Sequence, residues 1–126
     1  MREETRNWLK QAEMDLGAAQ GNLQIKNYFV SAFYSQQCAE KALKAFGIER
    51  TRETIKTHNL LEIAKKLRLP KEILEGLIEL NPDFIVSRYP DAANGVPGEM
   101  YDLKKAKIKV LYAEKVLEWA KSRIKK

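Results

Sequence analysis

Arg88-Tyr89-Pro90-Asp91 is the stretch of this sequence whose residue types best suit ligand binding. The guanidinium group of arginine is a planar fork that grips a carboxylate or a phosphate through two hydrogen bonds. Tyr89 can stack or form a hydrogen bond, and Pro90 restrains the backbone beside it. The alternative is structural, because Arg88 could instead form an ion pair with Asp91 or with Glu40. The residues leave both interpretations open.

Two lysines inside an apolar helical segment form a second candidate for anion binding. Lys41 and Lys44 are three positions apart and therefore share a helix face. Together with Arg88 and Tyr89 they would bind a nucleotide or polyphosphate, provided that the segment bearing Arg88 folds over them. The structural alternative is ordinary solvation, or an ion pair between Lys44 and Glu40 one helical turn earlier.

His58 is the one histidine of the chain. A zinc site made of histidines and most histidine relays need more such residues. One cysteine, Cys38, excludes a disulfide within the chain and a cysteine-cluster metal site, and we expect a buried, inert thiol. No glycine-rich phosphate loop is present either, so no cofactor is expected. His58 would cap or pack beside a helix, or it would act as a general acid or base with Arg52 or Arg88 stabilising the phosphate.

The size and charge of the chain limit the classes of protein that it can belong to. Its 126 residues are expected to form a single domain spanning 1–126, with its own core. The net charge of +6 resides after residue 101, where nine basic residues accompany three acidic ones. This basic strip can attract a polyanion, or it is a solvated face. No signal-like start or membrane-length apolar run is present, so we expect a soluble, cytoplasmic protein.

The elements that must position these residues are all helices. Apolar residues recur at three- and four-residue steps over 2–23, 28–47 and 102–123, and over two short segments starting near Thr57 and Pro70. Gly47 is predicted to cap the central helix, and Thr57 to be the next N-cap or its neighbour. The buried positions of the short segments are predicted to be Leu60, Leu61, Ala64, Leu67, Ile73, Leu74, Leu77 and Ile78.

The last helix is predicted to pack along a heptad seam. This seam consists of Leu103, Ala106, Val110, Ala113, Leu117, Ala120 and Ile124. Before it, residues 81–102 read as one long irregular loop that contains three of the four prolines but is apolar enough to pack on the bundle. No segment alternates as a strand would. The fold predicted is all-α, an up-and-down bundle of four main helices with the third one broken.

Four blocks of this sequence, in order and spacing, resemble the HEPN domain family. They are WLKQAEMDLGAAQ near the start, YFVSAFYSQQCAEKALKAFG in the centre, THNL at 57–60 and SRYPD at 87–91. The resemblance implies a bundle of four or five helices that forms a homodimer through helix faces. It also implies a nucleotide-binding role and a partner, since many relatives are encoded beside a minimal nucleotidyltransferase and the pair can act as a toxin and its antidote.

Several branches of that family are metal-independent ribonucleases, and this sequence departs from their pattern. Those enzymes use an arginine followed a few residues later by a histidine, near the last helix. No histidine follows Arg88, and Asn94 cannot exchange a proton near neutral pH. Arg52 and His58 have a suitable spacing but precede the third helix.

Three functions remain as hypotheses. The one we favour is a dimeric nucleotide-binding or partner module of a nucleotidyltransferase-linked, toxin–antitoxin-like system, without catalysis of its own. The alternatives are a ribonuclease acting at the dimer cleft on RNA, and a purely structural helical dimer.

Overall fold

Helices make up this fold, and the computed structural model describes residues 1–125. Its elements are α1 (Glu3–Gln24), α2 (Tyr28–Thr51), α3 (Leu60–Leu67), α4 (Lys71–Leu80), α5 (Asp83–Val86), α6 (Pro90–Ala93), the 3₁₀ turn η1 (Pro97–Glu99) and α7 (Leu103–Ile124). Within these 125 residues there is no strand, which confirms the all-α prediction. In the described part of the chain, no helix is long and apolar enough to cross a membrane.

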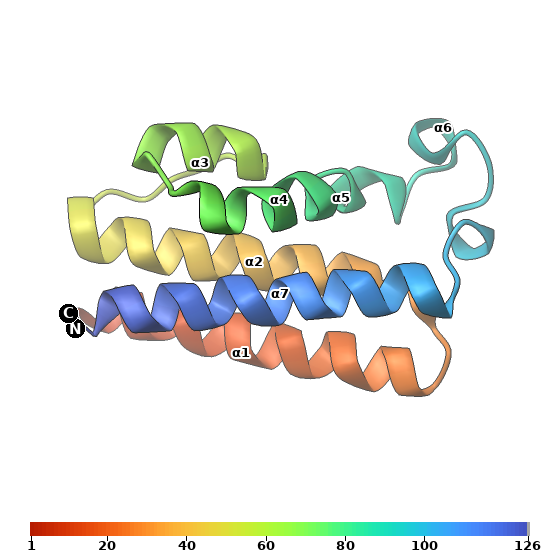
Figure 1. Cartoon of the computed structure of the whole chain (residues 1–126), viewed down its shortest axis with the longest axis horizontal. Coiled ribbons are helices and arrows are strands. Elements are labelled where there is room, and N and C mark those ends of the chain that lie inside the picture. The colour runs from red at the N-terminus through yellow and green to blue at the C-terminus, as the bar shows by residue number, and fades with distance from the viewer. Residues whose placement is uncertain (126) are drawn as a thin grey trace.

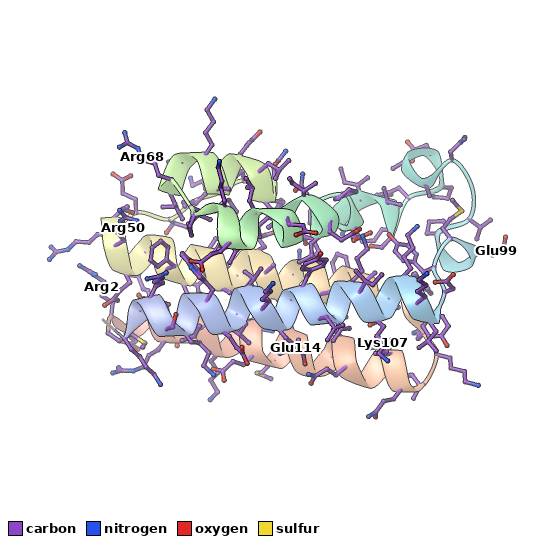
Figure 2. The ribbon with its side chains drawn as sticks, in the orientation of Figure 1. Arg2, Arg50, Arg68, Glu99, Lys107 and Glu114 are labelled. Carbon is purple, nitrogen blue, oxygen red and sulfur yellow. The ribbon has the colours of Figure 1, made fainter. Side chains whose placement is uncertain are left out.

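The three long helices run side by side, and the broken third helix covers them. Figure 1 shows α2 and α7 in the middle, α1 along one side, α3, α4 and α5 along the other, and both termini at the same end. Arg2 and Arg50 lie at that end (Figure 2), where the Arg2 guanidinium donates to the carbonyl oxygen of Glu49 at 2.8 Å. This hydrogen bond therefore joins the start of α1 to the end of α2 at the end of the bundle where both termini lie.

α2 is the central element because it contacts α1, α7 and the covering helices at once. Its buried positions occur all around the helix rather than on one face, and many are small, such as Ala32, Ala39 and Ala42, which have no exposed surface. Small residues let neighbouring helices approach closely. The aromatic residues Phe29 and Phe33 of this helix are only half-buried. Polar side chains on α2 must consequently find partners inside the protein.

The predicted end of α2 at Gly47 is wrong. The helix continues to Thr51, and Arg52 closes it in the left-handed conformation with φ of 65°. Gly47 has no positive φ; it is needed because a Cβ atom at this position would lie 3.0 Å from Ile55 Cδ1 and 3.3 Å from Leu67 Cδ1. Close packing of the chain that follows explains the glycine.

The two short helices follow the prediction in outline, but the N-cap of the first is Asn59 rather than Thr57 or its direct neighbour. Asn59 caps α3 by accepting from the amides of Leu61 and Glu62, and the hydroxyl of Thr57 accepts from the Asn59 amide. Leu61, which was predicted to be buried, is exposed, and Ile63, which was not predicted, is buried. In α4, which starts after Pro70, the predicted core residue Ile78 is exposed and Leu80 is buried instead.

Residues 81–102 were predicted to be irregular, and they instead contain α5, α6 and η1. The predicted packing on the bundle is correct, because Asp83 is buried and joins this segment to α7. Its carboxylate accepts from the Tyr101 hydroxyl at 2.5 Å and lies 2.8 Å from the buried Lys109 Nζ. α7 itself starts at the N-cap Asp102, and its seam is buried from Ala106 to Ile124, leaving Leu103 exposed. Lys126 of the predicted basic strip lies outside the described residues.

Candidate functional site

His58 connects a buried ion pair of α2 to the surface. Its Nδ1 lies 2.9 Å from Glu40 Oε2, and the same oxygen lies 3.0 Å from Lys44 Nζ. The side chains of Glu40 and Lys44 are 3% and 4% exposed, whereas that of His58 is 54% exposed. The ion pair between Glu40 and Lys44 confirms the structural alternative considered for Lys44.

Gln36, one turn before Glu40, holds the backbone at His58. Its side-chain amide donates to the His58 carbonyl oxygen at 3.2 Å and reaches Glu40 Oε1 at 3.4 Å. Gln37 donates to Gln36 Oε1 at 2.8 Å. The polar residues that interrupt the apolar pattern of α2 therefore form one network that anchors the segment before α3.

Arg88 lies on a cluster of aromatic rings. Its guanidinium carbon is 4.5 Å from the ring centroid of Phe84, 5.0 Å from that of Phe33 and 5.1 Å from that of Tyr89. The imidazole of His58 stacks on Phe84 with centroids 4.4 Å apart and an interplanar angle of 14°. Phe84 thus brings Arg88 and His58 into one site, which we call the His58–Arg88 site and which also includes Phe33 and Tyr89.

A surface depression of about 310 Å³ adjoins this site. Its lining residues are Thr57, His58, Asn59, Asn81, Pro82, Phe84 and Ile85. The side chain of Asn81 accepts from the Leu60 amide at 2.8 Å, which joins the end of α4 to the start of α3. The depression therefore has a wall fixed by hydrogen bonds, an aromatic ring and an exposed imidazole.

The four residues predicted to bind a nucleotide fall into two groups. Lys41 forms an ion pair with Asp15 of α1 and Lys44 one with Glu40. Arg88 and Tyr89 are exposed and belong to the aromatic cluster. Among residues 1–125 no hydrogen bond or ion pair joins the lysines to Arg88, nor Arg88 to Asp91 or Glu40. The link between the groups runs through Glu40, His58 and Phe84.

Arg52 and His58, the pair considered for a ribonuclease, lie apart along the link between α2 and α3. Arg52 is exposed at the end of α2, and no hydrogen bond or ion pair connects it to His58 in the described chain. Arg88, the other arginine considered, is the one that shares an aromatic contact with His58. Phe33 and Phe84 were not predicted for the site; the sequence signal was the four-residue spacing of Phe84 and Arg88, which places both on one side of a helical turn.

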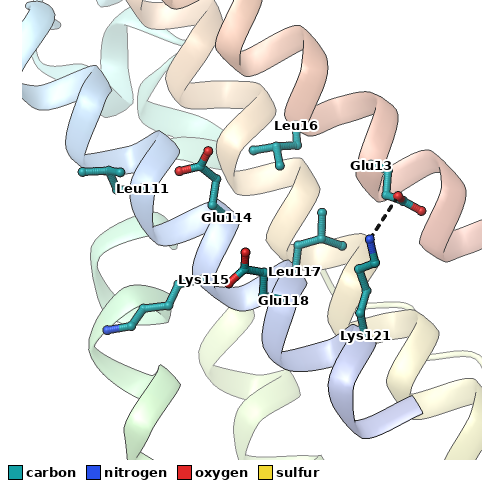
Figure 3. Close-up of a pocket in the computed structure, with 8 residues that line it drawn as sticks. All are labelled: Glu13, Leu16, Leu111, Glu114, Lys115, Leu117, Glu118 and Lys121. Atoms are coloured by element: carbon teal, nitrogen blue, oxygen red, sulfur yellow. Dashed lines mark hydrogen bonds and ion pairs between the residues drawn. The ribbon is translucent and has the colours of Figure 1, made fainter. Parts of the chain in front are cut away.

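A second hollow, of about 540 Å³, lies between α1 and α7 and is lined by three carboxylates and two lysines (Figure 3). Lys121 is paired with Glu13 at 3.3 Å, and the other charged residues of the lining are Glu114, Glu118 and Lys115. Because the carboxylates outnumber the lysines, this groove suits an anion less well than the His58–Arg88 site. Cys38 is buried as predicted, and burial raises its pKa to about 12, with Asp15 adding to the effect. Within residues 1–125, no cluster of histidine, cysteine and acidic side chains could hold a metal ion.

Comparison with known proteins gives consistent matches over nearly all of the chain. The family model described as "HEPN domain" matches residues 5–124. A protein of Methanocaldococcus jannaschii named "Putative toxin MJ1304" is 34% identical over 131 residues, which cover 94% of this chain and 86% of that protein.

Solved structures have the same fold. The crystal structure of TT1696 from Thermus thermophilus superposes with a TM-score of 0.89 at 29% identity, covering 97% of this chain and 99% of that one. ST0689, described as an archaeal HEPN homologue, gives 0.82 at 34% identity, with 98% and 99% covered. A HEPN domain protein of Thermotoga maritima gives 0.69 at 25% identity, with 92% and 95% covered.

Proposed function

This chain belongs to the HEPN domain family, and on that premise we propose that it binds nucleotides or single-stranded RNA as a module of a toxin–antitoxin-like system. The His58–Arg88 site is the proposed binding surface. The observation that carries this proposal is the position of Arg88, which is exposed and rests on three aromatic rings beside the half-exposed His58. The name of the Methanocaldococcus jannaschii relative supports the toxin context.

The chemistry of this site suits a phosphate with a base attached. Arginine donates to phosphate oxygens through its planar fork, and no carboxylate neutralises Arg88 within residues 1–125. Tyr89 is 48% exposed, so part of its ring is open to stacking by a base. Lys44, by contrast, is neutralised by Glu40 and supports the site from beneath rather than by contact, whereas Lys41 is neutralised by Asp15 of α1 and lies outside the site.

Titration of a labelled single-stranded RNA and of labelled ATP, followed by fluorescence anisotropy, tests this proposal. We expect saturable binding that weakens in Arg88→Ala and in His58→Ala. Arg52→Ala is the matched control, because it removes an exposed arginine outside the site and should leave binding unchanged. Absence of binding at millimolar nucleotide and micromolar RNA would reject the proposal and leave a partner module alone.

A second function, metal-independent ribonuclease activity, is favoured by the contact between His58 and Glu40. A histidine whose one ring nitrogen faces a buried carboxylate has the arrangement used for proton transfer. Arg88 would then stabilise the phosphate. Incubation of the protein with RNA in EDTA should give cleavage that is lost in His58→Ala. RNA that stays intact with wild-type protein would exclude this function.

The proposal includes a second copy of the chain and a nucleotidyltransferase partner. Apolar side chains are exposed on the outer sides of α1 and α7, among them Met14 at 60% and Leu111 at 56%. Such side chains favour association. Light scattering at micromolar concentration should give the mass of a dimer, and a monomer mass would contradict it. Co-expression with a nucleotidyltransferase encoded beside this chain should give a complex that copurifies.

A further inference from the structure

The carboxylate of Glu40 is surrounded by hydrogen-bond donors. Lys44 Nζ lies 3.0 Å and His58 Nδ1 2.9 Å from Oε2. The side-chain amides of Gln36 and Gln37 each lie 3.4 Å from Oε1. An ionised carboxylate can accept from all four of these donors.

Lys44 requires that ionised form. Its side chain is 4% exposed, and its other neighbour is the ring of Trp8, 5.6 Å from Nζ. Protonation of Glu40 would leave a buried ammonium group without a counter-charge, which is costly. An ionised Glu40 has no proton to donate, so the hydrogen bond to His58 needs a proton on Nδ1. In the neutral imidazole Nε2 then carries the free lone pair.

We infer that Glu40 is a positioning residue of the His58–Arg88 site, which holds His58 in its Nδ1–H tautomer and so leaves Nε2 as an acceptor for the 2′-hydroxyl of a bound ribonucleotide. Lys44 is the second member of this arrangement, because it keeps the carboxylate charged. The hydrogen bond from Gln36 to the His58 carbonyl fixes the backbone below the same ring. This inference rests on the proposed function only for the identity of the ligand.

Nitrogen NMR of the imidazole tests the tautomer without any ligand. His58 is the one histidine of the chain, so its two ring nitrogens can be assigned unambiguously after ¹⁵N-histidine labelling. The test variant is Glu40→Met/Lys44→Met, which removes both buried charges together and so leaves neither one unpaired. Asp15→Leu/Lys41→Met is the matched control: it removes the neighbouring ion pair between α1 and α2, in which Lys41 also donates to Gln37 at 3.1 Å but contacts neither Glu40 nor His58.

At a pH where His58 is neutral, we expect the Nδ1–H tautomer to dominate in the wild type and in the control. In Glu40→Met/Lys44→Met the proton should move to Nε2. Binding of single-stranded RNA should weaken in this variant by about fivefold, the equivalent of one hydrogen bond, and stay unchanged in the control. Thermal melts of the two double variants show whether each remains folded.

The two proposals fail in different ways. Nε2–H dominance in the wild type, or an unchanged tautomer in the folded test variant, would overturn the role of Glu40 whether or not RNA binds. A dominant Nδ1–H tautomer that is lost in the test variant, in a protein that binds neither RNA nor ATP, would confirm the effect of Glu40 on the imidazole and reject the proposed ligand. RNA binding that weakens equally in both double variants would overturn the positioning role, since any loss of a buried ion pair would then suffice.

Discussion

Arg88 donates a hydrogen bond from Nε to the carbonyl oxygen of Phe84 at 2.8 Å, while its guanidinium carbon lies 4.5 Å from the centroid of the Phe84 ring. One arginine thus contacts both the backbone and the side chain of the residue four positions before it. The carbonyl uses one N–H of the guanidinium, and the four others stay available to a ligand. Phe84 is at the same time the residue on which His58 stacks.

Arg88→Lys should lose most of this arrangement despite keeping the charge. Lysine has no planar fork, so it cannot hold the Phe84 carbonyl and present two parallel donors to a phosphate. We expect RNA affinity to fall roughly tenfold, about 1.4 kcal/mol, with an unchanged melting temperature. Anisotropy titration measures the affinity, and Arg68→Lys, an exposed arginine at the end of α3, is the control. Equal affinity of Arg88→Lys and wild type would show that Arg88 contributes charge alone.

The buried pair of Asp83 and Lys109 should respond differently to single and double substitution. Both side chains are about 3% to 4% exposed, and burial raises the pKa of Asp83 although Lys109 and Tyr101 act against this. Lys109→Met leaves a buried carboxylate without its cation and should cost about 3–5 kcal/mol of unfolding free energy. Asp83→Leu/Lys109→Met should cost less than that single substitution. Urea denaturation measures the unfolding free energy of both variants, and a double variant as unstable as Lys109→Met or less stable would contradict the coupling.

The bundle was predictable because each long helix can be recognised from its own residues. The three- and four-residue spacing of apolar positions is the same whichever element the helix packs against, so the extents of α1 and α7 are close to the prediction. The end of α2 was not predictable in this way. Gly47 resembles a cap in the sequence, but its small size serves a contact with Ile55 and Leu67, which come from later segments. Only the tertiary packing distinguishes these two uses of glycine.

The candidate site was predictable in its residues but not in their grouping. Lys44, His58 and Arg88 were all candidates, and a salt bridge of Lys44 with Glu40 was considered as the structural alternative. The contact between His58 and Glu40 spans 18 residues and depends on the path of the link between α2 and α3. No periodicity encodes that path. The stacking of His58 on Phe84 is likewise a contact between two segments far apart in the chain, and no sequence pattern predicts it.

Cys38 should be inert in the folded protein and reactive in the unfolded one. Burial raises its pKa from 9.0 to about 12, and the thiolate is the reactive form. The stability that this thiol contributes is complete below pH 9.0 and is lost as the pH rises from 9.0 towards 12, because only the unfolded state ionises in that range. A thiol reagent at a pH of about 8.5, near the pKa of a free thiol, should therefore modify the protein in urea but not in buffer. Rapid modification of folded protein would mean that α2 opens locally.

Two glycines inside helices should respond to alanine with opposite signs. A Cβ atom added at Gly17 in α1 would lie in open space, whereas one added at Gly76 in α4 would lie 2.9 Å from Tyr112 Cδ1. Alanine in a helix interior is about 0.5–1 kcal/mol more favourable than glycine, so Gly17→Ala should raise the unfolding free energy by that amount. Gly76→Ala gains the same helix preference, but the added methyl group would press against the ring of Tyr112, whose hydroxyl is 3.1 Å from Glu75 Oε1. Overpacking of this kind typically costs about 1–3 kcal/mol, so we expect the unfolding free energy of Gly76→Ala to fall by about 0.5–2 kcal/mol. Urea denaturation of the two variants side by side measures this difference in unfolding free energy.

A leucine at position 112 tests the cause of the loss. Added to Tyr112→Leu, the Gly76→Ala substitution should cost less unfolding free energy than it does in the wild type, because the shorter side chain leaves room for the added methyl group. An equal gain in both single variants would show that α4 and α7 can separate slightly at no cost.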